Sequence, residues 1–441
     1  MSVSVAIVGS GPGGFYTADA LLKSGADCRI DIIERLPTPF GLIRDGVAPD
    51  HQSIKKVWKS FERTALDARV RYYGNVKVGR DVHLDELRAL YDAVVLAVGA
   101  PLDRRLGIPG EDKEGVVGSG AFVGWYNAHP DHVDLDPDLD TTAVAVIGNG
   151  NVAIDIVRVL AKTPAEMAAS DLPDSAADAI HNAPITELYM FGRRGPVEAK
   201  FTNVELREMG RLENCVPLVD GAQLPDEVGG LPERERRLKE KNLATLREFA
   251  AMRPEGKTKR LHFCFYAAPV AILGEKKVEG LRLERTRIED GRAVGTGELF
   301  EVACGLVVAA IGYHSEPLEG MPFDEKRGIA VNSEGRVADG VYAVGWIKRG
   351  PTGVIGTNKP DGEVAAEYIR ADFPRGGKPG RKEFESRLRE KGVRWVTYPE
   401  WQTIDQAEIA KARPGAPRRK FLTVGEMLAA IDKAPVRAGT G

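Results

Sequence analysis

Two glycine-rich turns of the same design constrain the fold of this chain more than any other feature. Each follows a short apolar stretch, Val3–Val8 in one case and Ala143–Ile147 in the other, about 140 residues further along. A strand, then Gly-x-Gly-x-x-Gly or Ala, then a helix is the dinucleotide-binding fingerprint, because glycines permit the tight turn and let the backbone approach a pyrophosphate. The turn residues are Gly9, Gly11, Gly13 and Gly14 in the first unit and Gly148, Gly150 and Ala153 in the second. Two such turns predict two bound dinucleotides, between which a hydride can pass.

The repeated unit also predicts the fold class and the domain organisation. We expect an α/β protein with two Rossmann-like dinucleotide-binding domains, one inserted into the other. The buried-strand pattern of Tyr91–Gly99 ends in glycine, and Gly305–Gly312 repeats it after the second unit. We therefore expect residues 1–103 to form the first part of one domain and 104–318 the inserted domain. Residues 319–441 then complete the first domain and add a C-terminal segment.

Composition excludes several classes of protein. The formal net charge of −3 gives no general attraction for nucleic acid or for an anionic membrane. No apolar run approaches the ~20 residues that span a bilayer. The four cysteines lie far apart without a C-x-x-C pair, which excludes a zinc ribbon, a local iron–sulfur site and a redox disulfide. We expect reduced thiols, no metal site and a cytoplasmic, bacterial-type protein. The first strand begins at Val3, which leaves no room for a targeting segment unless the chain is already processed.

The residues that follow the second strand of each unit predict which dinucleotide binds where. Glu34 lies 20 residues after Gly14, where a carboxylate can accept both hydroxyls of a ribose. In the second unit, the expected strand Ile185–Phe191 leads instead to Arg193 and Arg194. Two guanidinium groups favour a ribose 2′-phosphate, so the second site is expected to bind NADP. For the first site a second nicotinamide dinucleotide remains an alternative, and FAD is the more common pairing.

The sequence also predicts the local structure of four further segments. The loop Arg35–Asp50 is long enough to be functional, and Ser53–Leu66 is expected to form one helix. The charged run Arg234–Lys241 is expected to begin an exposed helix. The polar segment Ala412–Lys420 is expected to be a mobile tail.

These residues resemble the adrenodoxin reductase family, the ferredoxin–NADP⁺ reductases built on the glutathione-reductase architecture. The similarity extends from about Val3 to about Asp405. The segments that carry it are Pro39–His51, Gly148–Asp155, Gly192–Pro196, Phe201–Glu208 and Gly345–Gly353. General flavin disulfide reductases have Gly-Asp where this chain has Gly345-Trp346, and that difference is itself typical of the family.

The resemblance implies roles for individual residues. The implied contacts to FAD are Gly13, Glu34, Leu42, Val78, Trp346, Gly353, Val354 and Ile355, and Gly353 would also lie near the nicotinamide. The implied contacts to NADP are Asn149, Gly150, Asn151, Val152, Arg193, Arg194 and Glu205. His51 and Glu208 match a polar pair near the reacting rings, and Asp155 matches a carboxylate close to that histidine. Two structural alternatives remain open from the residues alone. His51 could be a loop histidine with a structural hydrogen bond, and Glu208 could belong to a solvated helix face.

The implied function is electron transfer from NADPH through FAD to a ferredoxin-type iron–sulfur protein, by hydride transfer and then single-electron steps. Because redox cysteines are lacking, the electrons must leave one at a time. Two enzymes of other kinds remain as alternatives, an NADPH-dependent flavin monooxygenase and the electron-input subunit of a larger complex. A third alternative is a nucleotide-sensing module without turnover.

Docking of an acidic ferredoxin requires a local basic face, because the chain is slightly acidic overall. Arg207 and Arg211 are four residues apart, and we expect them on one face of a helix that follows Asn203. Arg234, Arg236 and Arg237 are further candidates beside them. The protein is expected to be a monomer.

Overall fold

The computed structural model describes residues 2–434, and its first sheet combines both ends of the chain. The strand order is β18-β19-β4-β1-β2-β3, and all neighbours are parallel except β18 and β19. The strands are β1 (Val3–Val8), β2 (Cys28–Ile33), β3 (Val70–Tyr73), β4 (Ala93–Leu96), β18 (Arg336–Ala338) and β19 (Val341–Ala343). Every residue of β1 is buried. This burial explains its unbroken apolar sequence, since both faces of a parallel sheet are covered by other elements.

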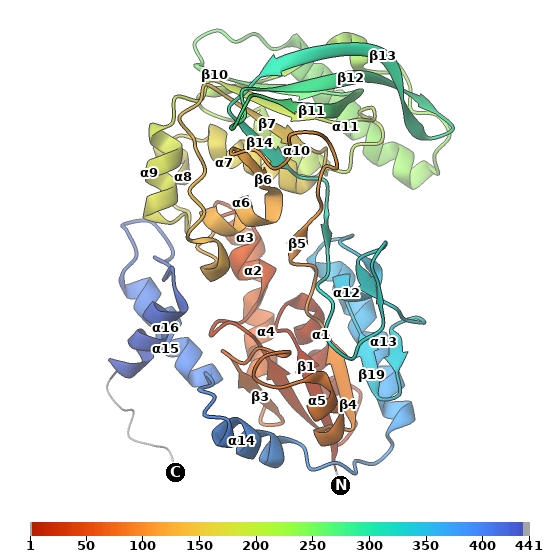
Figure 1. Ribbon diagram of the computed structural model, residues 1–441, viewed down its shortest axis with the longest axis vertical. Helices are drawn as coiled ribbons and strands as arrows, with labels where there is room; N and C mark the ends of the chain where they lie inside the picture. Colours follow the sequence, from red (N-terminus) through yellow and green to blue (C-terminus); the bar gives the residue numbers. More distant parts are fainter. Residues whose placement is uncertain (1, 435–441) are drawn as a thin grey trace.

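Helices cover both faces of the first sheet. Alternate residues of β1 point to opposite faces, so Val5 and Ile7 join one core while Ala6 and Val8 join another. The helices that pack into the first core are α1 (Pro12–Lys23), α4 (Trp58–Ala65), α13 (Asn358–Asp372) and α15 (Tyr398–Ala410). Those that pack into the second are α5 (Leu84–Leu90) and α14 (Arg381–Glu390). Figure 1 shows this sheet in the lower half of the molecule.

The second sheet has the order β6-β14-β7-β8-β10-β9 and is parallel throughout. Its strands are β6 (Val116–Gly118), β7 (Ala143–Ile147), β8 (Glu187–Phe191), β9 (Cys215–Val219), β10 (Lys259–Cys264) and β14 (Leu306–Ala309). One face packs on α6 (Ser119–Tyr126), α7 (Asn151–Ala161), α9 (Asp174–Asn182), α10 (Asn203–Met209) and α11 (Glu233–Ala251). The other face is covered by an antiparallel sheet of β11 (Ala267–Leu273), β12 (Gly280–Glu289) and β13 (Arg292–Ala303), at the top of Figure 1.

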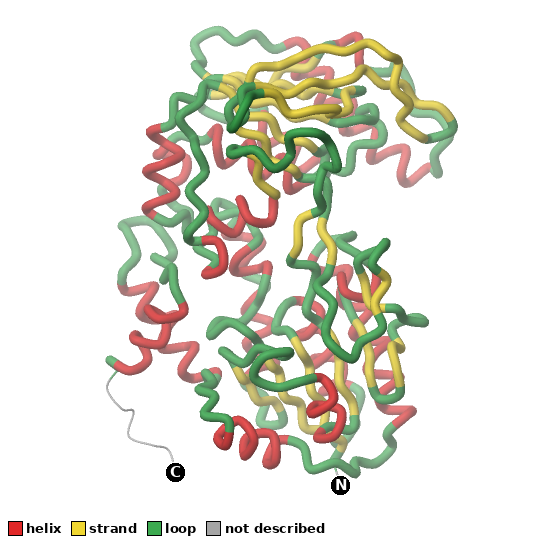
Figure 2. Tube along the Cα trace, viewed as in Figure 1, coloured by secondary structure: helices red, strands yellow, loops and turns green. Residues whose placement is uncertain are grey.

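Two chain segments connect the sheets. The chain leaves the first sheet through β5 (Leu102–Asp103) and returns to that sheet through β15 (Tyr313–His314). These two strands pair with each other in antiparallel orientation. Figure 2 shows the two segments side by side between the upper and lower halves. The strands from β6 to β14 thus form two sheets of their own, and in sequence they lie between the two pieces of the first sheet. The predicted fold class is confirmed, and the domain limits at 103/104 and 318/319 stay predictions.

Two expectations for the region after β2 need correction. The segment Ser53–Leu66 is not one helix, because it forms α3 (Gln52–Lys55) and α4 (Trp58–Ala65). The interruption coincides with Lys55, whose ammonium group turns inward to the carboxylate of Asp171 at 2.7 Å. The preceding loop, Arg35–Asp50, contains the short helix α2 (Leu42–Asp45).

The expectation of a mobile C-terminal tail is wrong. We call Arg413–Phe421 the C-terminal strap; it joins α15 to α16 (Val424–Asp432). The Lys420 side chain is only 1% exposed, and its Nζ donates to the carbonyls of Arg44 at 2.7 Å and Asn127 at 2.9 Å. Burial of the amine lowers the pKa of Lys420 to about 7. In Figure 1 the strap reaches from the lower blue helices toward α9, where Arg419 pairs with Asp174.

Candidate active site

The first glycine-rich turn has the geometry of a dinucleotide site. Gly9 has φ +106°, and a Cβ there would lie 2.4 Å from the carbonyl oxygen of Ala97. A Cβ on Gly14 would lie 2.1 Å from the carbonyl oxygen of Gly9, so the helix can pack on the turn only without a side chain. A Cβ on Gly11, by contrast, would meet nothing within 4 Å. No side chain caps the N-terminus of α1. Open space in front of uncapped helix N–H groups fits a pyrophosphate.

Glu34 lies beside this turn at the end of β2. Its Oε2 accepts hydrogen bonds from the Ser10 amide at 3.0 Å and the Ser10 hydroxyl at 2.7 Å. Its Oε1 accepts one from the Leu36 amide at 3.2 Å. The carboxylate is therefore fixed next to the turn but remains partly exposed. This placement fits recognition of ribose hydroxyls.

Two distant segments flank the turn. The first segment contains Gly41, where an added Cβ would lie 3.1 Å from the Cα of Gly11. The next residue, Leu42, is 49% exposed. The second segment, in the C-terminal part of the chain, contains Gly345, where an added Cβ would lie 4.0 Å from the Cα of Gly13. Trp346 follows directly and begins α12 (Trp346–Arg349). An exposed leucine and a half-buried tryptophan on either side of the turn form a surface that fits an apolar ring system.

The remaining residues assigned to FAD have different surroundings. Trp346 stacks on Tyr313 with 5.9 Å between ring centroids, and its indole N–H donates to the carbonyl of Thr352. This bond holds the loop in which Gly353 adopts φ +87° and Val354 is 63% exposed. Ile355 then begins a short 3₁₀ helix, Ile355–Thr357, that leads to α13. The side chain of Val78 is packed in the core under the first sheet, so a contact to a ligand would come from its backbone.

The second glycine-rich turn repeats the geometry of the first. Gly148 has φ +148°, and a Cβ there would lie 2.2 Å from the carbonyl oxygen of Ala310. A Cβ on Gly150 would meet nothing within 4 Å, and no side chain caps α7. Asn149 lies over Gly192, and its Oδ1 is buried without a hydrogen-bond partner in residues 2–434. An orphaned amide beside an open helix N-terminus fits a polar ligand.

The neighbouring side chains complete this turn. Asn151 accepts a hydrogen bond from the Thr202 amide at 2.8 Å, which ties α7 to the start of α10. Val152 packs partly against the core. Glu205, on α10, is nearly buried and faces the cluster around His51. Asn151 and Val152 therefore position the helix, and Glu205 belongs to the polar cluster between the sheets.

Arg193 and Arg194 follow β8 at the edge of the second site. Their backbone is fixed, because the carbonyl of Arg193 accepts a hydrogen bond from the Thr286 hydroxyl at 2.7 Å. Within the described residues neither guanidinium has an ion-pair partner. Lys239 of α11, which the sequence did not single out, lies close enough for burial and the charge of Arg194 to lower its pKa. The positive charge of Arg193 and Arg194, without an ion-pair partner in the described residues, fits a phosphate group.

A polar cluster forms where the loop after β2 meets the helices of the second sheet. His51 Nε2 lies 3.0 Å from Glu208 Oε2 on α10 and 3.5 Å from Glu205 Oε2. His51 Nδ1 lies 4.0 Å from Asp155 Oδ1 on α7. The His51 side chain is 11% exposed and that of Glu208 33%. The structure thus brings together the polar pair and the neighbouring carboxylate that the resemblance implies near the reacting rings.

Arg158 of α7 lies at the centre of this cluster and was missed by the sequence analysis. Its side chain is fully buried, and Nε and Nη2 donate to the carboxylate of Asp50 at 2.8 and 3.0 Å. Nη1 donates to Asp155 at 2.7 Å and to Glu205 at 3.4 Å. Lys162 adds a second cation to Asp50 at 2.8 Å. The one available signal was an Asp–Arg pair three residues apart on an otherwise apolar helix.

The cluster sets the protonation of its members. Burial lowers the pKa of His51, but the hydrogen bond to Glu208 and the carboxylates nearby outweigh it, so the pKa is raised. Burial raises the pKa of Glu208, but the contacts with His51 and Arg158 outweigh it and the pKa is lowered. Burial raises the pKa of both Asp155 and Glu205. The result is an ionised Glu208 against an imidazole that holds its second proton more tightly than usual.

The same cluster contains possible metal ligands. In two overlapping triads, Asp50–His51–Glu208 and His51–Asp155–Glu205, the ligand atoms lie within 4.8 Å of one another. The guanidinium of Arg158 already pairs with Asp50, Asp155 and Glu205 from within the cluster. The absence of a metal site stays a prediction.

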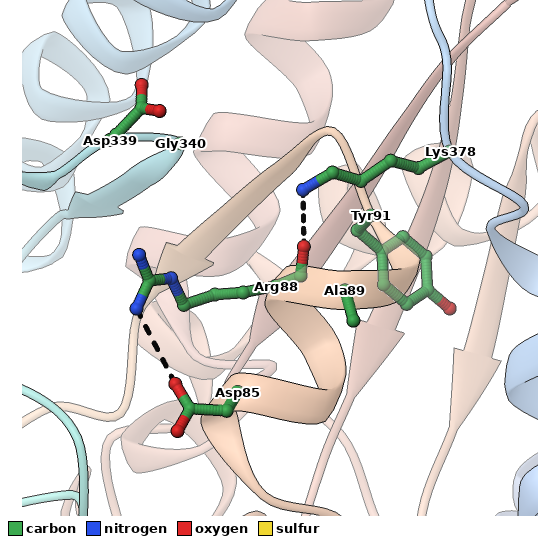
Figure 3. A pocket seen from close by; sticks show the side chains of 7 residues that line it. All are labelled: Asp85, Arg88, Ala89, Tyr91, Asp339, Gly340 and Lys378. Atoms are coloured by element: carbon green, nitrogen blue, oxygen red, sulfur yellow. Dashed lines mark hydrogen bonds and ion pairs between the residues drawn. The ribbon is translucent and has the colours of Figure 1, made fainter.

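A separate hollow of about 280 Å³ lies at the edge of the first sheet, away from both turns. Figure 3 shows its lining of Asp85, Arg88, Ala89, Tyr91, Asp339, Gly340 and Lys378. Arg88 pairs with Asp85 at 3.5 Å, and Lys378 donates to the Arg88 carbonyl. Because the hollow lies away from both glycine-rich turns, it is not part of the candidate active site.

The two turns and the cluster between them define an oxidoreductase class with two dinucleotide sites. The known proteins to which this chain is similar belong to the same class. The family model described as pyridine nucleotide-disulphide oxidoreductase matches residues 3–180. The mitochondrial NADPH:adrenodoxin oxidoreductase of Homo sapiens is 40% identical over 96% of this chain and 91% of that protein. NADPH-ferredoxin reductase FprA of Mycobacterium tuberculosis is 41% identical over 96% of this chain and 98% of that protein.

A solved structure gives the same result. M. tuberculosis FprA in complex with NADPH superposes with a TM-score of 0.94 at 40% identity, covering 98% of this chain and 100% of that chain. The chain belongs to the family of adrenodoxin and NADPH-ferredoxin reductases. FAD and NADP(H) are the cofactors characteristic of this family of flavoprotein oxidoreductases. The predicted family and cofactors are confirmed, and the roles of individual residues stay predictions. None of the helices within residues 2–434 is long and apolar enough to cross a bilayer.

Proposed function

We propose that this protein transfers electrons from NADPH, through FAD, to a ferredoxin-type iron–sulfur protein. The observation that carries the proposal is the contact between His51 and Glu208. His51 follows the loop that flanks the first turn, and Glu208 belongs to a helix that covers the second sheet. The contact therefore supports an arrangement in which the reacting ends of the two dinucleotide sites lie next to each other.

The residues of the first turn hold FAD in this proposal. The open N-terminus of α1 receives the pyrophosphate at Gly11, and Glu34 accepts the ribose hydroxyls. The exposed side chains of Leu42 and Val354 support the apolar ring from opposite segments of the chain. When bound, FAD supplies the redox chemistry, since a flavin accepts a hydride and returns its electrons singly.

The second turn holds NADPH. The N-terminus of α7 at Gly150 receives the pyrophosphate, and Asn149 offers its unpartnered amide oxygen. Arg193 and Arg194 bind the 2′-phosphate, which explains the absence of ion-pair partners for them in the described part of the chain. His51 and Glu208 hold or move a proton near the reacting rings and orient the nicotinamide, with Asp155 beside them.

The cysteines support an external electron acceptor. All four are free thiols, and three of them are buried. Burial raises the pKa of Cys215, Cys264 and Cys304 to about 12, which leaves them unreactive near neutral pH. Since no dithiol accepts the electrons, they must leave the protein. Free thiols also fit the proposed location in the reducing cytoplasm, where we propose that the protein acts as a monomer.

The proposed docking face for the iron–sulfur protein is formed by Arg207 and Arg211. Arg207 is in the last turn of α10, next to Glu208, and both arginines are exposed without ion-pair partners within residues 2–434. Contrary to expectation, Arg211 lies beyond the end of α10 rather than on its face. Proximity to Glu208 favours this site, because electrons must leave near the flavin.

The other basic candidates lie elsewhere. The C-terminal part of α11 packs on Gly210 through Phe249, whereas Lys239 reaches back to the carbonyl of Ala199. Arg236 is therefore displaced from the docking face by roughly 20 Å along α11, at 1.5 Å per residue. Arg234, Arg236 and Arg237 are closer to the second dinucleotide site, and they are not beside Arg207.

Charge reversal tests the docking face. Arg207→Glu with Arg211→Glu should lower ferredoxin-dependent turnover steeply and leave ferricyanide reduction nearly unchanged. The wild-type rate should also fall as salt rises above ~0.1 M. Arg29→Glu with Arg71→Glu, on exposed positions of β2 and β3, makes the same charge change on the first sheet and serves as the control. Equal losses in the two double variants would contradict docking at Arg207.

The proposed reaction itself is tested by cytochrome c reduction with NADPH. The rate should depend on added adrenodoxin or bacterial ferredoxin. A flavin monooxygenase would consume NADPH with oxygen regardless of the added protein, and a nucleotide sensor would not turn over. An input subunit would require its own complex before passing electrons.

A further inference from the structure

The His51–Glu208 pair is assembled from residues that are 157 positions apart. Each belongs to a different structural unit, since His51 precedes α3 beside the first sheet and Glu208 lies on α10. A third group that contacts both units would help to keep this 3.0 Å hydrogen bond in place. Arg158 is placed to do so.

Arg158 contacts the pair from both sides. Its Nε and Nη2 hold the carboxylate of Asp50, the residue immediately before His51, and its Nη2 also lies 3.4 Å from His51 Nδ1. On the other side, its Nε lies 3.5 Å from Glu208 Oε2. A guanidinium can make these contacts together because its five N–H donors form a rigid planar fork.

The contact with Nδ1 also selects a tautomer of His51. Arg158 can only donate, so it favours the neutral imidazole in which Nδ1 carries no proton. The remaining proton then lies on Nε2, which faces Glu208 at 3.0 Å. Arg158 thereby directs the proton of the neutral imidazole toward the carboxylate of Glu208 rather than toward the guanidinium.

A lysine could replace the charge of Arg158 but not its geometry. Asp50 already has a second cation, since Lys162 lies 2.8 Å from its Oδ2. A single ammonium group cannot hold Asp50, Asp155 and His51 at the same time. Exchange of Arg158 for lysine thus separates orientation from charge, whereas a neutral residue would leave several buried carboxylates without a partner.

We infer that Arg158 is the positioning residue that orients His51, through Asp50 and Nδ1, so that its Nε2 proton faces Glu208. The inference rests on the proposed function only in that flavin reduction by NADPH is one of its readouts. Arg158 acts through His51, so its effect must disappear when His51 is absent.

The experiment is a double-mutant cycle with Arg158→Lys, His51→Ala and the combined variant, in the FAD-loaded protein. Arg158→Lys should slow flavin reduction in stopped flow roughly ten- to a hundredfold, as expected for a misplaced group. In the His51→Ala background the same change should alter the rate by less than about twofold. Arg381→Lys, which alters the buried pair with Asp31 on the first sheet, is the matched control and should leave the rate unchanged.

A second readout is independent of activity. The ¹⁵N shifts of the His51 ring, measured without nucleotide above its pKa, should show an unprotonated Nδ1 in the wild type and mixed tautomers in Arg158→Lys. The inference would be overturned if the rate effects of Arg158→Lys and His51→Ala simply multiplied in the combined variant. It would also be overturned if Arg158→Lys left the tautomer of His51 unchanged. If NADPH fails to reduce the flavin of the wild type, the proposed function fails, while the tautomer result still decides the role of Arg158.

Discussion

His51 Nε2 and Glu208 Oε2 lie 3.0 Å apart and join the loop after β2 to helix α10. If this pair acts on the reacting groups, His51→Ala and Glu208→Ala should slow flavin reduction more than they weaken NADP⁺ binding. Stopped-flow absorbance and equilibrium titration measure the two quantities. Glu248→Ala removes an exposed carboxylate on α11 and should change neither. Loss of binding without loss of rate would make the pair a binding element only.

The pH dependence of stability follows from the raised pKa of His51. A histidine whose folded pKa exceeds its unfolded value contributes stability that is fully present below the unfolded pKa, near 6.5. That contribution is lost as the pH rises through the folded pKa. The free energy of unfolding of the wild type, relative to His51→Gln, should therefore be largest near about pH 6 and decline toward about pH 9.

Urea unfolding at saturating FAD over this range measures the difference. Glu208 stays ionised throughout, because its lowered pKa lies well below the range. A difference that grows with pH would show that His51 is held neutral by burial, contrary to the structure.

The choice of nucleotide depends on Arg193 and Arg194. Replacing both by alanine should raise KM for NADPH and hardly change KM for NADH, since NADH has no 2′-phosphate. Loss of a charge-assisted contact costs about 1.5–3 kcal/mol, or roughly ten- to a hundredfold. Steady-state kinetics with the two nucleotides measures both KM values, and NADH serves as the control. Equal losses for both would refute the assignment.

The C-terminal strap should contribute strongly to stability. Lys420→Ala removes both carbonyl contacts and leaves the buried Asp171 with one cation fewer, a change that typically costs about 3–5 kcal/mol. Arg419→Ala, in the same segment, removes an exposed ion pair and should cost at most about 1 kcal/mol. Thermal unfolding compares the two variants. Similar melting temperatures would mean that the strap does not anchor the structure.

The elements with local signals could be predicted from the sequence. The strand Val3–Val8 has the predicted bounds, because a continuous apolar run that ends at the first glycine-rich turn determines it. Both glycine-rich turns have the expected geometry for the same reason. Arg234–Lys241 does begin an exposed helix, α11.

Features that depend on distant partners could not be predicted. Lys420 is buried because carbonyls and carboxylates about 250 to 380 residues away surround its amine. Arg158 looks like an ordinary helix arginine until the fold brings Asp50 to it, 108 residues away in sequence. The break between α3 and α4 likewise coincides with the contact of Lys55 to Asp171. Polar residues in such positions resemble solvated ones until the fold is known.

The central claim is that electrons from NADPH leave the protein singly to an iron–sulfur protein. An anaerobic titration with limiting NADPH, the FAD-loaded enzyme and excess adrenodoxin or bacterial ferredoxin tests it most directly. Because a hydride carries two electrons and one cluster accepts one, about two iron–sulfur proteins should be reduced for each NADPH oxidised. Bleaching of the flavin by NADPH without reduction of either iron–sulfur protein would contradict the account.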